Sequence, residues 1–278
     1  MISRPSATHR QDGSSSSERY VIPNLRNACR ILKLLSDSPD HLKAAEIARA
    51  LGIPVTTTLR IMTTLHLEGF VRKRGNQYEL GPVLIRLGTA ALSDTEIRAL
   101  ALPVLEKLTA RTDETSHLAV PCDGRSLIVA VEDSPHPLRA ASRPGFLADL
   151  HCSSTGKTFL AFLYKDRMQE LYGNATPSKR TPKTKTTLAS LNDEVEATLK
   201  RGYSLDDEEF NRGVRCLAAP VFDADGTVAA AVGITASTVR FTEERIPEMA
   251  AAVKDAATEL STLLGHSGAK SHTAERAR

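Results

Sequence analysis

The sequence predicts an α+β protein built from an N-terminal winged helix-turn-helix, a linker helix and a C-terminal domain with a central antiparallel sheet. Three observations carry this prediction. Residues 44–64 read as two short helices joined by a tight turn, a basic hairpin follows at 70–80, and short apolar runs of period two are interleaved with helical segments from residue 115 onward. The length of 278 residues suits two domains of ordinary size.

Composition and pattern divide the chain into five segments. The first 19 residues are rich in Ser and scattered charge and offer nothing to bury, so we expect a disordered tail. Positive charge is concentrated early, because residues 20–92 hold ten Lys and Arg against five Asp and Glu, whereas residues 93–278 hold 23 against 26. The expected boundaries are 1–19 for the tail, 20–81 for the winged helix-turn-helix, 82–98 for the linker helix, 99–266 for the second domain and 267–278 for a flexible tail.

Bulk properties argue against several classes of protein. No apolar run approaches the roughly 18 residues that span a bilayer, and the N-terminus lacks an apolar signal-peptide core, so we expect a cytoplasmic location. Cys29, Cys122, Cys152 and Cys216 stand far apart, with neither CxxC nor zinc-finger spacing. We therefore expect free thiols, no metal and no cofactor.

The helix-turn-helix prediction rests on residues 44–64. The first helix has an apolar face capped by Gly52, and that face consists of Ala44, Ile47, Ala48 and Leu51. In the second helix, Pro54 occupies the first turn and the buried stripe is formed by Leu59, Met62 and Leu65. This arrangement leaves four side chains facing outward, namely Thr56, Thr57, Arg60 and Thr64.

These outward side chains suit the major groove of DNA, where a Thr methyl group contacts thymine and Arg binds guanine. Three consecutive threonines are mediocre helix formers, which indicates a role other than helix stability. We interpret the second helix as a recognition helix. The alternative at this point is a plain amphipathic helical hairpin.

Two flanking elements complete the predicted DNA-binding unit. A supporting helix is expected from Asn24, as its N-cap, to the loop at 38–40, with Cys29 as a small core residue. After Gly69, two β-prone runs flank residues 74–76 and predict a hairpin. Basic side chains gather at its tip, as on a wing that reaches phosphates or the minor groove, and these are Arg72, Lys73 and Arg74.

The rest of the chain predicts a helical connector and then the sheet domain. Residues from 82 onward are helical, and Pro103 is expected to restart the helix. Strands are expected at 115–121, 126–132, 138–142, 216–222 and 228–235. Helices are expected at 153–164, with Ser153 or Ser154 as the cap, at 192–200, ended by Gly202, and at 242–264, capped by Thr242.

Four segments of the second domain mix polar groups with small residues and are candidates for a small-molecule site. They are residues 143–145, 151–157, 206–209 and 213–216. The second segment would place backbone N–H groups and hydroxyls at a helix N-terminus, where a carboxylate could bind, although an ordinary Ser-capped helix has the same pattern. The third is typical of a solvated acidic turn, in which one carboxylate could face a pocket.

A catalytic or metal site is a weaker interpretation of the same residues. His151, Cys152 and Asp206 could form a Cys/His hydrolytic set, or a metal site together with Cys216. Neither arrangement has a local sequence signature. We therefore expect no enzyme activity.

With these residues placed, the chain resembles the IclR family of bacterial transcriptional regulators over about residues 20–264. The resemblance lies in AAEIARALGIPVTTTLRIMTTLHLEGFV, the wing and YELGPVLIRLG, and then in LHCSSTGKTFLAFL and GYSLDDEEFNRGVRCLAAPVFDADGTVAAAVGITAS. It implies a GAF-like effector domain, dimerisation through the linker helix, and a small, usually carboxylate-bearing effector. The effector-binding residues that it implies are Ser154, Thr155, Asp206, Cys216, Gly233 and Thr235.

The resemblance also implies a function. We expect a ligand-responsive regulator, a repressor of a catabolic operon, that binds double-stranded operator DNA as a homodimer or a dimer of dimers. Gly233 stands where some keto-acid-binding relatives have Ser, so we expect room there for a larger ligand. The alternatives are a ligand-independent structural DNA-binding protein and a Cys-dependent enzyme with a DNA-binding appendage.

Overall fold

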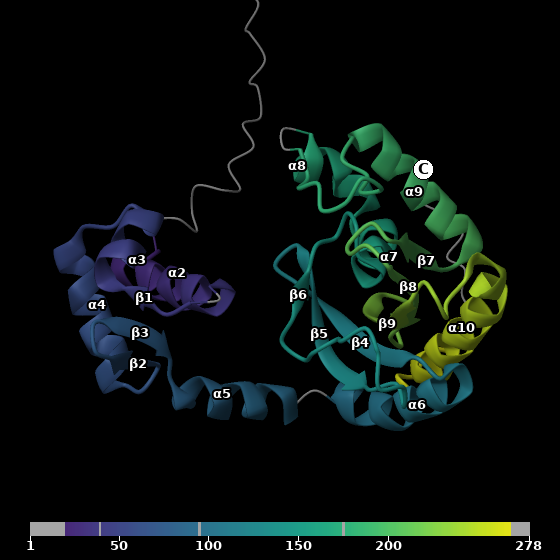
Figure 1. Cartoon of the computed structure of the whole chain (residues 1–278), viewed down its shortest axis with the longest axis horizontal. Coiled ribbons are helices and arrows are strands. Elements are labelled where there is room, and N and C mark those ends of the chain that lie inside the picture. Colours follow the sequence, from purple (N-terminus) through teal and green to yellow (C-terminus); the bar gives the residue numbers. More distant parts are fainter. Residues whose placement is uncertain (1–19, 39, 94–95, 174–175, 268–278) are drawn as a thin grey trace, which may run out of the picture. The chain divides into compact units, whose positions relative to one another are not determined.

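The computed structural model describes residues 20–38, 40–93, 96–173 and 176–267 (Figure 1). The tail expected at 1–19, and all but the first residue of the tail expected at 267–278, lie outside these residues. The chain divides into two compact units, Met1–Ala91 and Leu92–Arg278. Among the described residues, no helix has both the length and the apolar character needed to cross a membrane.

The first unit is a winged helix-turn-helix. Its described residues form three helices and a small sheet of strand order β1-β3-β2, followed by a further helix. These elements are α2 (Pro23–Asp37), β1 (Leu42–Lys43), α3 (Ala44–Leu51), α4 (Val55–Leu67), β2 (Val71–Arg74), β3 (Gln77–Leu80) and α5 (Pro82–Ser93). The turn between α3 and α4 depends on Gly52, which caps α3 in the left-handed conformation at φ 66°. Ile31, Ile47, Met62 and Val71 bring the helices and the hairpin onto one core.

Two predictions for this unit were wrong in their register. Helix α2 begins at Pro23 rather than after Asn24, and Cys29 is exposed while Ile31 and Leu35 are buried. Pro is well suited to the first helical position because it has no N–H that would need a partner. The buried face of α2 therefore includes Ile31 and Leu35 and does not include Cys29.

The buried stripe of α4 is also different from the predicted one. Leu59 is 44% exposed, whereas Thr58 is fully buried. Helix α4 begins at Val55, and the stripe of Thr58, Ile61, Met62 and Leu65 follows the 3.6-residue period. Thr58 can be buried because its Oγ1 donates a hydrogen bond to the Pro54 carbonyl oxygen at 3.2 Å.

The connector is two helices in sequence. Helix α5 ends at Ser93, and α6 extends over Glu96–Thr112 with Pro103 inside it. The prediction that Pro103 restarts the helix was therefore wrong. Residues 94 and 95, within the expected linker, lie outside the described residues.

The second unit is organised around a six-stranded antiparallel sheet of order β6-β5-β4-β9-β8-β7. Strands β4 (Thr115–Cys122) and β5 (Arg125–Glu132) form one hairpin, and β8 (Val214–Phe222) and β9 (Val228–Ser237) form another. Strand β4 pairs with β9, which joins the hairpins, while β6 (Leu147–Ala148) and β7 (Ser204–Asp207) form the edges.

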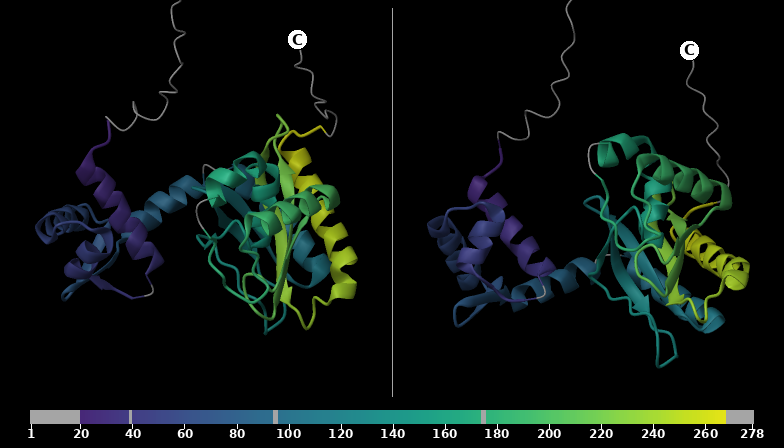
Figure 2. Two further views of the ribbon diagram at one scale, coloured as in Figure 1. Left: turned by 90° about the horizontal axis from the view of Figure 1, so that it is seen from above. Right: turned by 45° about the horizontal axis from the view of Figure 1, so that its top comes forward.

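Helices cover both faces of this sheet (Figures 1 and 2). Helices α6 and α10 (Ile246–Leu263) pack on one face over a core that includes Leu105, Val232 and Val253. Helices α7 (Ser154–Phe162), α8 (Met168–Tyr172) and α9 (Leu188–Arg201) lie on the other. The α+β class predicted from the sequence is confirmed.

Some local predictions for this unit were wrong. The strand expected at 138–142 is irregular, and the edge strand β6 lies further on. In the structure Arg240 Nη1 binds the Leu138 carbonyl oxygen at 2.8 Å, so this stretch is held by a side chain instead of a strand partner. The last helix begins later than expected, because residues Glu243–Arg245 form a 3-10 turn and Thr242 makes no side-chain capping hydrogen bond.

Candidate effector pocket and nucleic-acid interface

Helix α4 presents the side chains that the sequence assigned to the major groove. Thr56, Arg60 and Thr64 are exposed, and Thr57 is half-buried. Thr64 Oγ1 donates to the Arg60 carbonyl oxygen at 3.1 Å, which leaves the Thr64 methyl group and an acceptor lone pair for a partner. Leu59 adds an exposed apolar side chain to the same helix.

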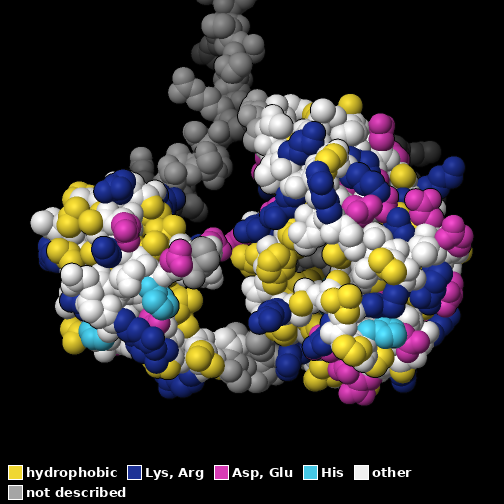
Figure 3. All heavy atoms as spheres, viewed as in Figure 1, with side chains coloured by type: hydrophobic (Ala, Val, Ile, Leu, Met, Phe, Trp, Pro, Cys, Tyr) yellow, Lys and Arg dark blue, Asp and Glu magenta, His cyan; other side chains and the backbone are white. Residues whose placement is uncertain are grey.

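The basic residues of the wing do not form one group. In the β2–β3 register Arg72 lies opposite Glu79, and the Glu79 Oε1 atom is 3.4 Å from Arg72 Nε and 3.2 Å from Arg74 Nε. Lys73 projects to the other face, where its Nζ lies 5.9 Å from the centre of the Tyr78 ring. The prediction that all three side chains gather at the tip ignored this alternation of side chains along the strand. Figure 3 shows the Lys and Arg side chains that are exposed on one face of the molecule.

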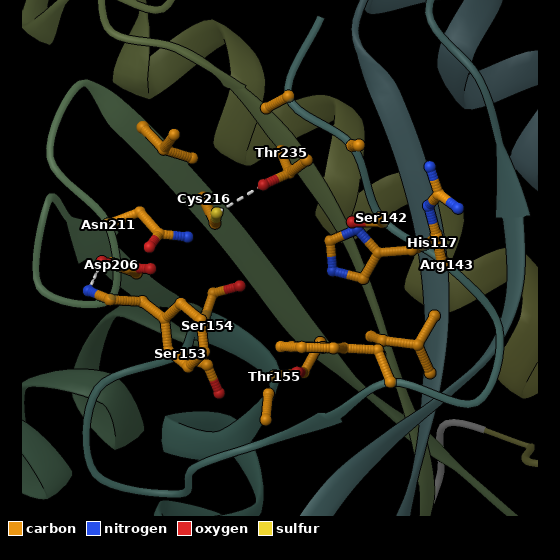
Figure 4. Close-up of a pocket in the computed structure, with 17 residues that line it drawn as sticks. His117, Ser142, Arg143, Ser153, Ser154, Thr155, Asp206, Asn211, Cys216 and Thr235 are labelled. Carbon is orange, nitrogen blue, oxygen red and sulfur yellow. Dashed lines mark hydrogen bonds between the residues drawn. The ribbon is translucent and has the colours of Figure 1, made fainter. Parts of the chain in front are cut away.

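The second unit contains a cavity of about 310 Å³ beside the N-terminus of α7 (Figure 4). Each of the four polar segments chosen from the sequence contributes at least one residue to it. The residues that line the cavity are His117, Ile128, Ala140, Ala141, Ser142, Arg143, Phe146, Ala148, Ser153, Ser154, Thr155, Asp206, Phe210, Asn211, Val214, Cys216 and Thr235. Of the six expected effector residues, all but Gly233 line this cavity.

Strand register explains how distant residues meet there. Cys216 of β8 pairs with Asp206 of β7 on one side and with Thr235 of β9 on the other. The Cys216 Sγ and Thr235 Oγ1 atoms are 2.5 Å apart. In the neighbouring row of the same sheet face, Gly233 lies between Ala218 of β8 and His117 of β4.

Helix α7 supplies the polar end of the cavity. Ser153 is its N-cap, and Ser153 Oγ accepts a hydrogen bond from the Gly156 N–H at 3.1 Å, as one of the two predicted caps. Ser126 Oγ donates to Thr155 Oγ1 at 2.7 Å, which fixes the Thr155 side chain. Ser204 Oγ donates to the Ser154 carbonyl oxygen at 2.5 Å and ties the helix to β7.

Asp206 is held in place by the loop that follows it. Its Oδ1 atom accepts hydrogen bonds from the N–H groups of Glu209 at 2.7 Å and Phe210 at 3.1 Å. Burial raises the pKa of this carboxyl group from 3.8 to about 7, against the opposing effects of Lys157 and the two N–H groups. A carboxyl group with such a pKa changes charge near neutral pH.

The acidic run 206–209 is not the solvated turn that the pattern suggested. Asp206 and Glu209 are buried, and Glu209 Oε1 accepts a hydrogen bond from Lys157 Nζ at 2.5 Å. Asp207 and Glu208 are partly buried and both are bound by Lys183, at 2.8 and 3.0 Å. Each carboxylate therefore has a defined partner.

Lys157 is the centre of a buried ionic network behind the cavity. It is 1% exposed, and its Nζ atom lies 3.4 Å from Glu194 Oε1 of α9 as well as against Glu209. Burial alone would raise the pKa of Glu194, but Lys157, Lys185 and Arg201 outweigh it and lower this pKa to about 2. The network fixes α7, α9 and the loop after β7 to one another.

Two phenyl rings that sequence reasoning missed lie on the wall of the cavity. Phe146 and Phe210 meet edge to face with ring centroids 5.9 Å apart, and the Arg180 guanidinium lies 4.1 Å from the Phe210 centroid. Each ring directly adjoins a segment that the polar pattern selected. Their position at the ends of 143–145 and 206–209 was the signal that could have identified them.

Gly233 does not provide the extra room that its lack of a side chain suggested. A Cβ atom there would lie 2.4 Å from the Leu217 carbonyl oxygen and 3.0 Å from the Ala218 Cβ atom. The glycine allows β8 and β9 to approach closely, and it does not line the cavity. The expectation of a larger ligand at this position was wrong.

The alternative catalytic set is not assembled. Asp206 and Cys216 face the cavity, whereas His151 Nε2 lies 2.9 Å from the Ser178 carbonyl oxygen. Burial raises the pKa of the Cys152 thiol to about 12, and burial together with Asp206 raises that of Cys216. Both thiols are therefore protonated at neutral pH and are poor nucleophiles.

A different group of side chains comes closest to a metal-binding arrangement. Among the described residues, potential ligand atoms of Asp149, His151 and Cys152 lie within 4.8 Å of one another. The Asp149 carboxylate, however, is bound by Arg125 at 3.2 Å and by Arg180 at 2.6 Å. A cation would have to compete with these two guanidinium groups, so we assign no metal to this group.

A winged helix-turn-helix unit joined to a sheet domain with a cavity defines the class of DNA-binding regulators that carry a small-molecule pocket. Comparison with family models identifies residues 25–75 as an IclR helix-turn-helix domain and residues 89–262 as the C-terminal domain of bacterial transcriptional regulators of the IclR type. The chain belongs to the IclR family of transcriptional regulators, whose members are regulators and not enzymes.

Individual relatives agree with this assignment. The transcriptional repressor IclR of Escherichia coli K12 is 31% identical over 248 residues, which cover 88% of this chain and 90% of the repressor. The crystal structure of Thermotoga maritima IclR is 32% identical, with a TM-score of 0.64 over 87% of this chain and 98% of that one. An IclR homologue from Microbacterium hydrocarbonoxydans, crystallised with 4-hydroxybenzoate, shares the fold at 23% identity and a TM-score of 0.70 over 87% of this chain and 98% of that one.

Proposed function

We propose that this protein is a repressor of a catabolic operon and that it senses a small organic acid through the cavity beside α7. The observation that carries the proposal is the cavity itself, where the N-terminal turn of a nine-residue helix and the hydroxyls of Ser154 and Thr155 face the same partly open space. Helix N-termini attract carboxylates through their free N–H groups and the helix dipole.

The relatives support this choice of function and of ligand class. Two of them, the Escherichia coli transcriptional repressor IclR and the Salmonella typhimurium acetate operon repressor, are named as repressors. The homologue crystallised with 4-hydroxybenzoate is an example of a protein of this fold in complex with a small carboxylate. The proposal places the protein in the cytoplasm, where it would meet operator DNA.

On the DNA side, we assign base-edge contacts to Thr56, Thr57, Arg60 and Thr64 of α4. The exposure of Thr56, Arg60 and Thr64 and the geometry of the helix-turn-helix support this assignment. Phosphate contacts are assigned to the wing residues Arg72, Lys73 and Arg74, which set the register of the protein on the duplex. We propose a homodimer or a dimer of dimers, because two-fold symmetric readers match pseudo-palindromic operators.

Regulation requires only that the acid bind one arrangement of the two units better than another. A few kcal/mol of differential affinity between DNA-competent and DNA-incompetent arrangements is enough to change operator occupancy. The buried ionic network around Lys157 supports such a role, because it holds the polar end of the cavity in a defined shape before ligand arrives.

A thermal-shift screen of the full-length protein against small organic acids, sugar acids and aromatic acids tests the proposal. A true effector stabilises the protein by mass action, by about 2.7 kcal/mol at one hundred times its Kd. An operator obtained by selection from random duplexes then shows whether the same acid releases DNA. If no acid stabilises the protein while DNA binding persists, the ligand-independent structural DNA-binding protein becomes the better interpretation.

A further inference from the structure

His117 is a buried imidazole whose Nδ1 atom has no hydrogen-bond partner among the described residues. The side chain projects from β4, in the middle of the sheet, is 4% exposed, and lines the cavity. Burial lowers its pKa from 6.5 to about 4. At neutral pH the ring is therefore uncharged and offers one donor and one acceptor nitrogen.

The sheet around His117 does not supply the missing partner. The residues opposite it in register are Gly233 on β9 and Val131 on β5, and neither has a polar side chain. The large majority of buried polar side-chain atoms in proteins are hydrogen-bonded, so an imidazole with an unpaired nitrogen in a cavity wall points to a ligand group that completes its hydrogen bonding.

The position of His117 in the cavity limits what that partner can be. The close-up shows the imidazole on the opposite side of the space from Ser154 and Asp206 (Figure 4). The surfaces in between are largely apolar and include Ile128 and Phe146. A ligand that spans the cavity therefore meets a polar site at each end and an apolar wall along its body.

The charges available at this end favour a neutral group over a second carboxylate. Among the lining residues, the permanently cationic side chain is that of Arg143, and Arg143 is exposed. The buried cation Lys157 lies behind the cavity and is already bound to Glu209. A second buried carboxylate at His117 would have only the solvent-exposed Arg143, drawn on the same side of the space in Figure 4, to compensate it.

We propose that His117 recognises a hydroxyl group on the effector, so that the pocket selects a hydroxylated monocarboxylic acid with an apolar body. This inference rests on the proposed function, since it assumes that an acid occupies the cavity with its carboxylate at α7. The hydroxyl completes the hydrogen bonding of the imidazole, and an acid that lacks it leaves the ring nitrogen unpaired. Discrimination of about tenfold is expected from one such hydrogen bond to a buried neutral group.

Matched pairs of acids that differ by one hydroxyl group test the inference on the full-length protein. Suitable pairs carry the hydroxyl group at the end far from the carboxylate, and they are 4-hydroxybenzoate with benzoate, 4-hydroxyphenylacetate with phenylacetate and 6-hydroxyhexanoate with hexanoate. Titration calorimetry gives the ratio of the two Kd values for each pair. We expect the hydroxylated member of at least one pair to bind the wild-type protein about tenfold more tightly.

Two variants of His117 and one control variant test whether the imidazole causes that preference. His117→Phe keeps an aromatic ring but removes both nitrogens, and we expect the ratio to fall to about one while the deoxy acid still binds. His117→Asn keeps a polar group near the position of Nδ1 and should retain part of the preference. His136→Phe is the matched control, because His136 does not line the cavity, and its ratio should equal that of the wild type.

The outcomes distinguish a failure of the proposed acid sensing from a failure of the proposed role of His117. If no acid binds the wild-type protein, acid sensing fails and this inference fails with it. If acids bind but no pair shows a preference, or if His117→Phe keeps the preference, the role of His117 is refuted while acid sensing stands. If His117→Phe does not fold, a ratio for His117→Asn equal to that of the wild type in every pair refutes the role of the ring.

Discussion

Replacing Asp206 with Asn should make the stability of the protein less dependent on pH. Asp206 is 1% exposed, and its Oδ1 atom accepts two backbone hydrogen bonds from Glu209 and Phe210. The Oδ1 atom of Asn can accept the same two bonds, so the substitution removes the charge and keeps the local structure. What changes is the cost of ionising a carboxyl group that burial disfavours.

The sign follows from the direction of the pKa shift. Burial raises the pKa of Asp206 from 3.8 to about 7, so the folded protein retains a proton that the unfolded chain releases. The stability that this proton provides is fully present below pH 3.8 and is lost as the pH rises through about 7. At 1.36 kcal/mol per pKa unit, the shift corresponds to about 4 kcal/mol in the free energy of unfolding.

Urea unfolding of both proteins at pH 4.5, 6 and 8, followed by far-ultraviolet circular dichroism, measures this difference. We expect Asp206→Asn to gain about 3 kcal/mol relative to the wild type between pH 4.5 and pH 8. Groups that titrate equally in both proteins cancel in the comparison. The control is Asp225→Asn in the exposed turn between β8 and β9, which should leave the pH dependence unchanged. A difference between Asp206→Asn and wild type that stays constant over this pH range would refute the reasoning.

Three further substitutions test other parts of the structure. Arg60→Ala should weaken operator binding by about 1–3 kcal/mol and relax discrimination at one base pair, measured by fluorescence anisotropy; unchanged binding to operator and random DNA would reject α4 as the reader. Gly233→Ala should lower the free energy of unfolding by about 1–3 kcal/mol, because its Cβ would collide with the Leu217 carbonyl oxygen, and a neutral result would mean that there is room after all. Lys157→Met should cost about 3–5 kcal/mol in urea unfolding because Glu209 stays buried without its main cation, and a loss below about 1 kcal/mol would show that Lys185 compensates.

The DNA-binding unit could be predicted closely because its elements are short and local. The apolar period and Gly52 correctly predicted α3, and the turn at Gly75 correctly predicted the hairpin. The exchange of Leu59 for Thr58 in the buried stripe could not be predicted from hydrophobicity. Thr58 satisfies its hydroxyl within its own helix, and this removes the penalty for burying it.

The cavity could be predicted only in part because it depends on strand register between distant segments. Alternation located the strands, and the polar segments and the family resemblance predicted that Thr155, Asp206 and Cys216 share a site; the structure places all three on the wall of one cavity. The strand pairing that places His117 beside Gly233 joins residues far apart in the chain, and no local sequence pattern predicts it. Because the sequence does not reveal this strand register, space was wrongly expected at Gly233.

On the proposed acid-sensing function, the charges around the cavity make its selectivity depend on neutral hydrogen bonds as much as on ionic attraction. Lys157 is bound to Glu209 and Glu194, His117 is uncharged, and Asp206 is partly protonated near pH 7. The interior therefore carries little net charge, and the attraction for an anion comes mainly from the N–H groups and dipole of α7. Such a site compensates one carboxylate and no more, so the remaining recognition must come from shape and from the unpaired imidazole. We therefore expect this pocket to distinguish acids that differ by a single hydroxyl group.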